Sequence, residues 1–482
     1  MVDFRPVGYV IGILLTLLGV AMIVPFLVDL AEGRGEWPVF VQSALVTGIF
    51  GVLLALACSN DAKEGLTIQQ TFLLTTGVWL ALPLFGALPF MFGSTEARYV
   101  DAFFEAMSGL TTTGATVFTE LDTMPKGLLL WRGILQWFGG IGIIVVAMVF
   151  LPELRVGGMQ IFKAEAFDTL GKILPKATTI AIQIAVIYLA VTMVCILAYF
   201  SVGLSAFDAT VHAMTTVATG GFSNYDASFG AFDAGAEYVC VIFMILASLP
   251  FVRYVQLVNG NQLALFKDVQ VKTFVTVVLI LALVTTLVVY TSLGFDGETA
   301  FRKALFNITS IISGTGYSSA DYGQWGGFLI TMFFFIGLIG GCAGSTACSV
   351  KIFRYQLVYA SVSAQLKKIR SPNGIFIPRY DGRAIDNDVL SSVMSFFIFF
   401  MVTLCIVAIL LAMTGLDLIT SISASASALG NIGPGLGDQI GPSGNYAGLS
   451  DLAKWILSAA MLIGRLELLA VYAILTIQFW RT

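Results

Sequence analysis

The sequence predicts an all-α polytopic membrane protein. Two N-terminal transmembrane helices are expected to precede four repeats of helix, re-entrant P-loop and helix around a pseudo-fourfold axis. Three observations lead to this fold class: the composition is strongly apolar, ten stretches are long enough to cross a membrane, and a glycine-containing turn recurs four times at similar spacing.

The composition excludes several classes of protein. Of 482 residues, 57% are hydrophobic and 11% are charged, and the mean hydropathy is +0.90. A soluble domain carries about 25% charged residues, because its core needs a polar cover. The net charge of -4 offers no basic surface to a polyanion. A soluble enzyme, a disordered protein and a nucleic-acid-binding protein are therefore excluded.

Ten apolar stretches approach the roughly 20 residues that a transmembrane helix needs. The first lacks the small-residue cleavage site of a signal peptide, so we interpret it as a helix that stays in the membrane. The predicted spans are 8–30, 38–58, 69–93, 127–151, 177–201, 236–258, 272–294, 325–350, 389–415 and 453–480. The cysteines match no zinc or disulfide framework and are predicted to be buried packing residues: Cys58, Cys195, Cys240, Cys342, Cys348 and Cys405.

The connections between these spans differ in charge. Those on one side hold most of the Lys and Arg residues: 59–68, 152–176, 259–271 and 351–388. On the other side, loops 202–235 and 416–452 contain no Lys or Arg. By the positive-inside rule, the basic connections and both chain ends are predicted to be cytoplasmic.

Four connections on the less basic side end in a similar turn of small residues. They read S-G-L-T-T-T-G-A, M-T-T-V-A-T-G-G, S-I-I-S-G-T-G-Y and S-A-L-G-N-I-G-P, and we align them on Gly114, Gly220, Gly316 and Gly433. These glycines lie 96 to 117 residues apart, and self-similarity at such a period indicates a repeat architecture. The predicted organisation is 1–62 for the two N-terminal helices and 63–165, 166–262, 263–375 and 376–482 for four pore repeats.

Four such turns that converge on one axis form an ion pathway. Non-helical backbone at membrane depth is tolerated only where it is buried in protein or lines a wet cavity. Glycine keeps a Cβ atom out of a narrow lumen, and carbonyl oxygens replace the water around a monovalent cation. The C-terminal end of each re-entrant helix adds partial negative charge. Acids after the turns either concentrate cations at the mouth or are ordinary solvated residues: Glu120, Asp122, Asp226, Asp321 and Asp438.

Several segments resemble a known family. M-S-G-L-T-T-T-G-A-T-V (107–117) and W-R-G-I-L-Q-W-F-G-G-I-G-I-I-V (131–145) are similar to the TrkH/TrkG family, the membrane subunits of bacterial Trk potassium uptake systems. Segments 214–223 and 340–351 are similar to it as well. The likeness covers nearly the whole chain. Ten spans, two of them additional at the N-terminus, match the TrkH branch rather than the shorter KtrB branch of the superfamily.

The resemblance implies one K⁺ pore in each subunit of a homodimer in the bacterial inner membrane, regulated by a cytoplasmic TrkA-type nucleotide-binding ring. K⁺ is then the transported ion, and the chain itself needs no organic cofactor. The filter residues implied by matching motifs are Thr112, Thr113, Gly114, Ala218, Thr219, Gly220, Gly314, Thr315, Gly316, Asn431, Ile432 and Gly433. Glycine at 114 matches the K⁺-selective pattern, whereas the fourth loop departs from the family with Ile432 in place of Thr.

The eighth predicted span contains the glycine-rich segment F-I-G-L-I-G-G-C-A-G-S-T-A-C-S (335–349). Each glycine weakens a helix by roughly 1 kcal/mol relative to alanine, so a broken helix is predicted. Close helix packing through small residues is the alternative. The resemblance favours a mobile intramembrane gating loop and implies these gate residues: Gly340, Gly341, Cys342, Ala343, Gly344 and Ser345.

Arg465 lies in the middle of the last predicted span, with Glu467 two residues further on. Residues i and i+2 do not share a helix face, so these two are not expected to pair. A charge at this depth faces a partner or a cavity. It either forms an ion pair with another helix or, as the resemblance implies, contacts segment 340–344 and sets a cation barrier below the filter.

Three further features receive simpler interpretations. His212, the single histidine, is predicted to pack or hydrogen-bond in the second re-entrant helix, with a pH sensor as the alternative. Arg132 is predicted to be a snorkelling anchor at the outer surface. The basic connection 351–388 is expected to contact a regulatory partner or anionic membrane lipid.

Alternatives to K⁺ uptake remain. A Na⁺ pore or an H⁺- or Na⁺-coupled K⁺ symporter would differ in selectivity or coupling. An intramembrane enzyme needs a motif such as H-E-x-x-H or G-x-S-x-G, and the sequence contains neither. A non-conducting scaffold leaves the four repeated turns unexplained.

Overall fold

The computed structural model describes residues 3–33, 35–59, 66–146, 158–159 and 177–481. Most of the described chain is helical. Its one β-ladder pairs β1 (Arg379–Tyr380) with β2 (Arg383–Ala384) in antiparallel register. The protein is therefore an all-α multi-pass membrane protein, as the composition predicts.

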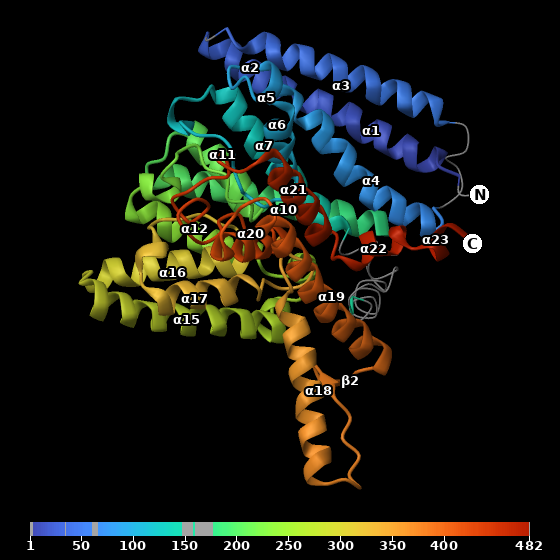
Figure 1. Cartoon of the computed structure of the whole chain (residues 1–482), viewed down its shortest axis with the longest axis vertical. Helices are drawn as coiled ribbons and strands as arrows, with labels where there is room; N and C mark the ends of the chain where they lie inside the picture. Colours follow the sequence, from blue (N-terminus) through green and yellow to red (C-terminus); the bar gives the residue numbers. More distant parts are fainter. Residues whose placement is uncertain (1–2, 34, 60–65, 147–157, 160–176, 482) are drawn as a thin grey trace.

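The two N-terminal spans pack against each other along their length (Figure 1). They comprise α1 (Arg5–Ala21) with α2 (Ile23–Glu32), and α3 (Trp37–Ala57). Glycines bring α1 and α3 into backbone contact, because a Cβ atom on Gly12 would lie 2.7 Å from the carbonyl oxygen of Gly51. Small residues at helix crossings permit such an approach in a membrane.

The rest of the chain repeats one unit four times. The first helices of the units are α4 (Ile68–Gly86) with α5 (Leu88–Phe92), α10 (Ala177–Ser201), α15 (Val269–Leu293) and α19 (Asn387–Ala412). The re-entrant helices are α6 (Tyr99–Leu110), α11 (Ala206–Val217), α16 (Gly297–Ser313) and α20 (Leu418–Gly430). The closing helices are α7 (Lys126–Val145), α12 (Ala234–Ala247) with α13 (Phe251–Val258), α17 (Gly327–Gly337), and α21 (Asp451–Arg465) with α22 (Leu469–Leu475).

The re-entrant helices have 12 to 17 residues, which is too short to cross a membrane. Three of them start at a side chain that accepts a backbone N–H bond: Ser205 for α11, Asp296 for α16 and Asp417 for α20. Such caps satisfy N–H groups that the first helical turn leaves unpaired. These three helices therefore have a defined start, and all four re-entrant helices end at one of the repeated glycine turns.

Short elements complete the fold. They are η2 (Leu121–Thr123), η4 (Ser228–Ala231), η5 (Tyr322–Gln324), α14 (Ala264–Lys267), α18 (Ile352–Arg370) and α23 (Ile477–Arg481). α18 lies in the basic connection 351–388, where the sequence analysis did not expect a helix. It projects away from the rest of the molecule, and the two chain ends lie together on another side (Figure 1).

Among the described residues, seven helices are long and apolar enough to span a membrane, and up to nine if two bent pairs count as spans. The predicted break in the eighth span is confirmed, because α17 ends at Gly337 and residues 338–351 are not helical. The sixth and tenth spans were predicted as continuous, which was wrong. They bend by 87° between α12 and α13 and by 110° between α21 and α22.

The two unexpected bends have different causes. Pro250 precedes α13 and has no N–H to continue the ladder of α12. At the second bend Glu467 and Leu468 have positive φ angles of 56° and 54°, although neither is glycine. The end of the predicted fourth span, the basic segment 152–176 apart from residues 158–159, and the predicted boundaries at 62 and 165 lie outside the described residues. The other two boundaries fall between helices and stay predictions.

Candidate ion pathway

The four turns after the re-entrant helices share one backbone conformation. Two residues before the glycine that ends each turn, the φ angle is positive, at Thr112, Thr219, Gly314 and Asn431. The next N–H group donates to a carbonyl oxygen five residues earlier: Thr113 to Ser108 at 2.8 Å, Gly220 to Thr215 at 2.8 Å, Thr315 to Ser310 at 2.9 Å and Ile432 to Ser427 at 3.0 Å. A glycine with positive φ follows in all four: Gly114, Gly221, Gly316 and Gly433. The repeat is thus a repeat of hydrogen bonding as well as of sequence.

This equivalence corrects the alignment of the second turn by one residue. The sequence pattern aligns Gly220 with Gly114, but Gly221 is the glycine with positive φ, at 77°. Gly220 is equivalent to Thr113, and Ala218 is the right-handed C-cap of α11, outside the repeated trio. The sequence offered two consecutive glycines, and only the backbone angles distinguish them.

The four turns also contact one another in a closed ring. A Cβ atom on Gly114 would overlap the carbonyl oxygen of Gly220, one on Gly221 that of Thr315, and one on Gly316 that of Ile432. On Gly433 it would lie 2.7 Å from the carbonyl oxygen of Thr113, which returns to the first turn. Each turn therefore needs glycine because the backbone of the next turn occupies the space of a side chain.

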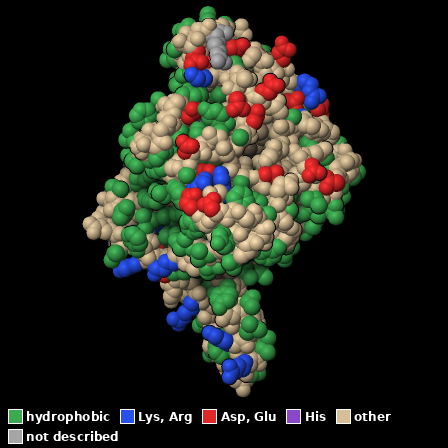
Figure 2. Space-filling view, turned by 90° about the vertical axis from the view of Figure 1, so that its left-hand side faces the viewer, with side chains coloured by type: hydrophobic (Ala, Val, Ile, Leu, Met, Phe, Trp, Pro, Cys, Tyr) green, Lys and Arg blue, Asp and Glu red, His purple; other side chains and the backbone are tan. Residues whose placement is uncertain are grey.

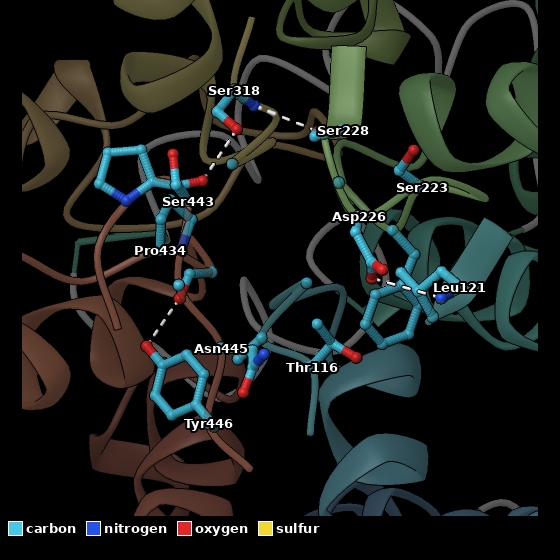
Figure 3. A pocket seen from close by; sticks show the side chains of 18 of the residues that line it. Thr116, Leu121, Ser223, Asp226, Ser228, Ser318, Pro434, Ser443, Asn445 and Tyr446 are labelled. Carbon is cyan, nitrogen blue, oxygen red and sulfur yellow. Dashed lines mark hydrogen bonds between the residues drawn. The ribbon is translucent and has the colours of Figure 1, made fainter. Parts of the chain in front are cut away.

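A cavity of about 310 Å³ lies next to this ring and is lined by all four turns. Figure 3 shows Thr116, Asp226, Ser318 and Tyr446 around it, each on a different repeat. Of the five acids predicted at the mouth, Asp226 is the one that lines the cavity, and its carboxylate accepts from the N–H of Leu121 at 3.3 Å. Acidic side chains also lie around a hollow on the face shown in Figure 2.

Within the described residues, no group of three or more His, Cys, Asp or Glu side chains is placed to hold a metal ion. The closed ring offers backbone carbonyl oxygens of the four turns as the candidate ligands of a cation. His212 bonds to the carbonyl oxygen of Asp208 at 2.9 Å and to Ser223 Oγ at 3.1 Å, so its predicted hydrogen-bonding role is confirmed. All six cysteines are free, and four are buried as predicted, whereas Cys58 is half-buried and Cys405 is exposed.

Arg132 is buried beside the first two turns, so its predicted role as a surface anchor was wrong. Its side chain is 1% exposed, and its Nε lies 2.8 Å from a carboxylate oxygen of Glu105. Its Nη1 donates to the carbonyl oxygen of Ser223 at 2.7 Å, while Glu105 accepts from the N–H of Val117 at 2.9 Å. This buried pair joins the chain beyond the first turn to the chain beyond the second. Glu105, the one acid in the middle of the apolar α6 sequence, was a signal that the sequence analysis did not use.

The non-helical segment 338–351, which we call the intramembrane loop, contacts the first turn at Thr112, a residue that does not line the cavity. Cys348 Sγ is 3.8 Å from Thr112 Oγ1. Further along the loop, the N–H of Cys342 donates to the carbonyl oxygen of Ser248 at 3.0 Å, and the carbonyl of Gly344 accepts from the N–H of Phe251 at 2.9 Å. The break between α12 and α13 thus exposes backbone groups that the loop satisfies, as buried non-helical backbone requires.

Arg465 contacts the intramembrane loop at Cys348 rather than at the predicted segment 340–344. It donates to Cys348 Sγ, and to the carbonyl oxygen of Gly139 at 3.0 Å. No carboxylate in the described part of the chain lies within 4.0 Å of it, and its buried Nε has no hydrogen-bond partner there. Glu467 instead bonds to Lys351 at 2.9 Å and to Arg354, so the expectation that Arg465 and Glu467 do not pair is confirmed.

Comparison with known proteins gives consistent matches over the chain. The sequence profile of the TrkH family, described as cation transport proteins, matches residues 36–479. The Trk system potassium uptake protein TrkI of Halomonas elongata is 38% identical over 99% of this chain and 97% of its own length. TrkH of Escherichia coli (strain K12) is 34% identical over 99% of both chains. The crystal structure of the potassium transporter TrkH from Vibrio parahaemolyticus covers 100% of both chains with a TM-score of 0.92 and 33% identity.

Proposed function

This chain belongs to the TrkH family of cation transport proteins, and we propose that it is the membrane subunit through which a Trk system takes up K⁺ across a bacterial inner membrane. Its relatives are named as potassium transport proteins, so the chain is a transporter rather than an enzyme. Accumulation of K⁺ needs no ATPase site in the chain, because a monovalent cation gains about 2.3 kcal/mol per 100 mV of membrane potential.

The observation that carries this proposal is the closed ring of four glycine turns. Rings of carbonyl oxygens replace the hydration shell of K⁺, and the C-terminal ends of four re-entrant helices favour a cation. The proposed ligands are carbonyl oxygens of Thr112, Thr113 and Gly114; Thr219, Gly220 and Gly221; Gly314, Thr315 and Gly316; and Asn431, Ile432 and Gly433. Gly221 replaces Ala218 in this set, because the backbone angles shift the second turn by one residue.

We propose that the intramembrane loop is the gate. Residues 340–345 and Cys348 are buried, and the loop contacts both the first turn at Thr112 and the break between α12 and α13. In this proposal K⁺ passes only when this segment moves. Arg465 adds a positive charge beside Cys348, and a charge at membrane depth without a carboxylate partner repels cations strongly. Gating in this proposal is the displacement of the loop together with this charge.

The proposed assembly is a homodimer with a cytoplasmic TrkA-type ring and both chain ends on the cytoplasmic side. The sequence contains no G-x-x-x-x-G-K-[ST] motif, so a nucleotide would act through such a partner. The last turn of α18 carries Lys367, Lys368 and Arg370, and basic side chains lie on the projecting part of the molecule (Figure 2). This projection is the proposed contact for the partner, and anionic lipid is the alternative.

Rb⁺ uptake into liposomes that contain the purified protein tests the function, with K⁺ and Na⁺ as competitors. We expect K⁺ to compete and Na⁺ not to, and Gly114→Ser to erode that preference. Gly203→Ser is the matched control, because Gly203 also has a positive φ but no atom within 4 Å of its Cβ position. Equal competition by Na⁺ in the wild type would favour the alternative of a Na⁺ pore, and uptake that requires a proton or Na⁺ gradient would favour a symporter.

A further inference from the structure

One of the four equivalent filter positions lacks a side chain. Thr113 bonds through Oγ1 to Thr111 Oγ1 at 2.8 Å and to Asn431 Nδ2 at 3.0 Å. Thr315 bonds through Oγ1 to Ser313 Oγ at 2.7 Å. Ile432, at the same position in the fourth turn, is 5% exposed and packed in the apolar core. Three turns are thus held by their own side chain, and Gly220 in the second turn has none.

Gln136 fills the corresponding space from α7. Its Nε2 donates to the carbonyl oxygen of Gly220 at 2.5 Å, and its Oε1 accepts from the N–H of Phe222 at 3.1 Å. The side chain is fully buried. A Cβ atom on Gly220 would overlap the Gln136 amide group, so the amide lies where the side chain of residue 220 would begin. Arg132, one helical turn earlier on α7, holds the same turn at the carbonyl of Ser223.

We propose that Gln136 takes the place of the missing side chain at Gly220 and is a positioning residue for discrimination between K⁺ and Na⁺. The inference rests on the proposed function, because it concerns the filter of that pore. Selectivity depends on the spacing and number of the carbonyls around the ion. Two consecutive glycines give the second turn more backbone freedom than the others have. Without the amide clamp, the turn can close around the smaller Na⁺.

The test removes the Gln136 amide and supplies a threonine side chain at position 220 instead, first separately and then together. Gln136→Ala removes both hydrogen bonds of the amide. The readout is the Na⁺ concentration that half-inhibits Rb⁺ uptake divided by the K⁺ concentration that does so. We expect this ratio to fall about fivefold, the factor that corresponds to the net free energy of one hydrogen bond. Gly220→Thr alone collides with the Gln136 amide and lowers both the melting temperature and the uptake. The double variant Gln136→Ala with Gly220→Thr has space for the threonine side chain, because the Gln136 amide is gone. The φ angle of residue 220 is not positive and therefore suits threonine. We expect this variant to recover most of the ratio.

A matched control separates this role from general packing. Gln70 is also buried and bonded at both ends of its amide, to the N–H of Thr67 at 2.9 Å and the carbonyl oxygen of Asp3 at 2.9 Å. Gln70→Ala is expected to keep the wild-type ratio. A wild-type ratio in Gln136→Ala, or a double variant no more selective than Gln136→Ala, would overturn the inference.

A second readout covers variants that conduct poorly. An ion that binds the folded filter raises the melting temperature, so we expect K⁺ to stabilise the wild type more than Na⁺ and to lose this advantage in Gln136→Ala. A preserved K⁺ advantage overturns the inference. The comparison with Gly114→Ser separates the two proposals: if that variant also leaves selectivity unchanged, the filter itself is wrong, whereas a silent Gln136→Ala beside an altered Gly114→Ser rejects only the role of Gln136.

Discussion

Lys351 Nζ lies 2.9 Å from a carboxylate oxygen of Glu467, so the last residue of the intramembrane loop is tied to the bend between α21 and α22. Arg354, on the first turn of α18, bonds to the other oxygen of the same carboxylate. All three side chains are buried. Buried ion pairs therefore connect the intramembrane loop to the final helix pair, and neither can move independently without breaking these ion pairs.

We expect Glu467→Gln to destabilise the protein by about 3–5 kcal/mol, because it leaves Lys351 and Arg354 buried without their counter-charge. Thermal unfolding in detergent measures the effect. The control is Glu298→Gln on α16, which is expected to change the melting temperature little, because the Glu298 carboxylate is exposed and Arg302 keeps its ion pair with Glu237. Equal melting temperatures for the two variants would show that the buried cluster does not hold the bend.

We expect Arg465→Ala to raise leak conduction about tenfold, which corresponds to removing ~1.4 kcal/mol from the barrier. The variant takes away the positive charge beside Cys348, and Arg465→Lys retains it. Rb⁺ uptake in the absence of any regulatory partner measures the leak. Unchanged uptake at normal protein levels would reject the barrier, and an equal leak in Arg465→Lys would assign it to geometry rather than charge.

We expect Glu105→Gln to cost about 3–5 kcal/mol of stability, because Arg132 is then buried without its carboxylate. Since this pair joins the first two turns, Na⁺ competition should also increase. Replacing both residues, as Glu105→Gln with Arg132→Met, should recover part of the stability but not the selectivity. Arg98→Gln is the control, because its contacts with Asp101 and Asp451 are exposed. Additive losses in the double variant would contradict a direct interaction.

The alignment of the second turn is tested by comparing alanine at its two glycines. Gly221→Ala meets the backbone carbonyl of Thr315 and forces a positive φ on alanine, so we expect Rb⁺ uptake to be lost. Gly220→Ala meets the Gln136 side chain, which can shift, and should keep part of the uptake. If Gly220→Ala were the more damaging variant, the alignment on Gly220 would be restored.

Much of this architecture follows from short-range features of the sequence. Apolar length located the helices, and clustered glycines located the break after Gly337. The bend at Glu467 was missed because its two positive-φ positions are Glu467 and Leu468 rather than glycine. The ion pairs at this bend come from Lys351 and Arg354, more than 100 residues away. The burial of Arg132 was missed for the same reason, since its partners Glu105 and Ser223 meet it only in the fold.

The ring of turns lies within one polypeptide, and its four quarters differ in chemistry: threonine stands at 113 and 315, glycine at 220 and isoleucine at 432. In a pore assembled from identical chains, a single codon change would alter all four quarters together. Here it alters one. Natural variation can therefore change the ion preference of such a pore through one turn at a time. A substitution that weakens ion binding in one turn can be compensated by a second substitution in a neighbouring turn.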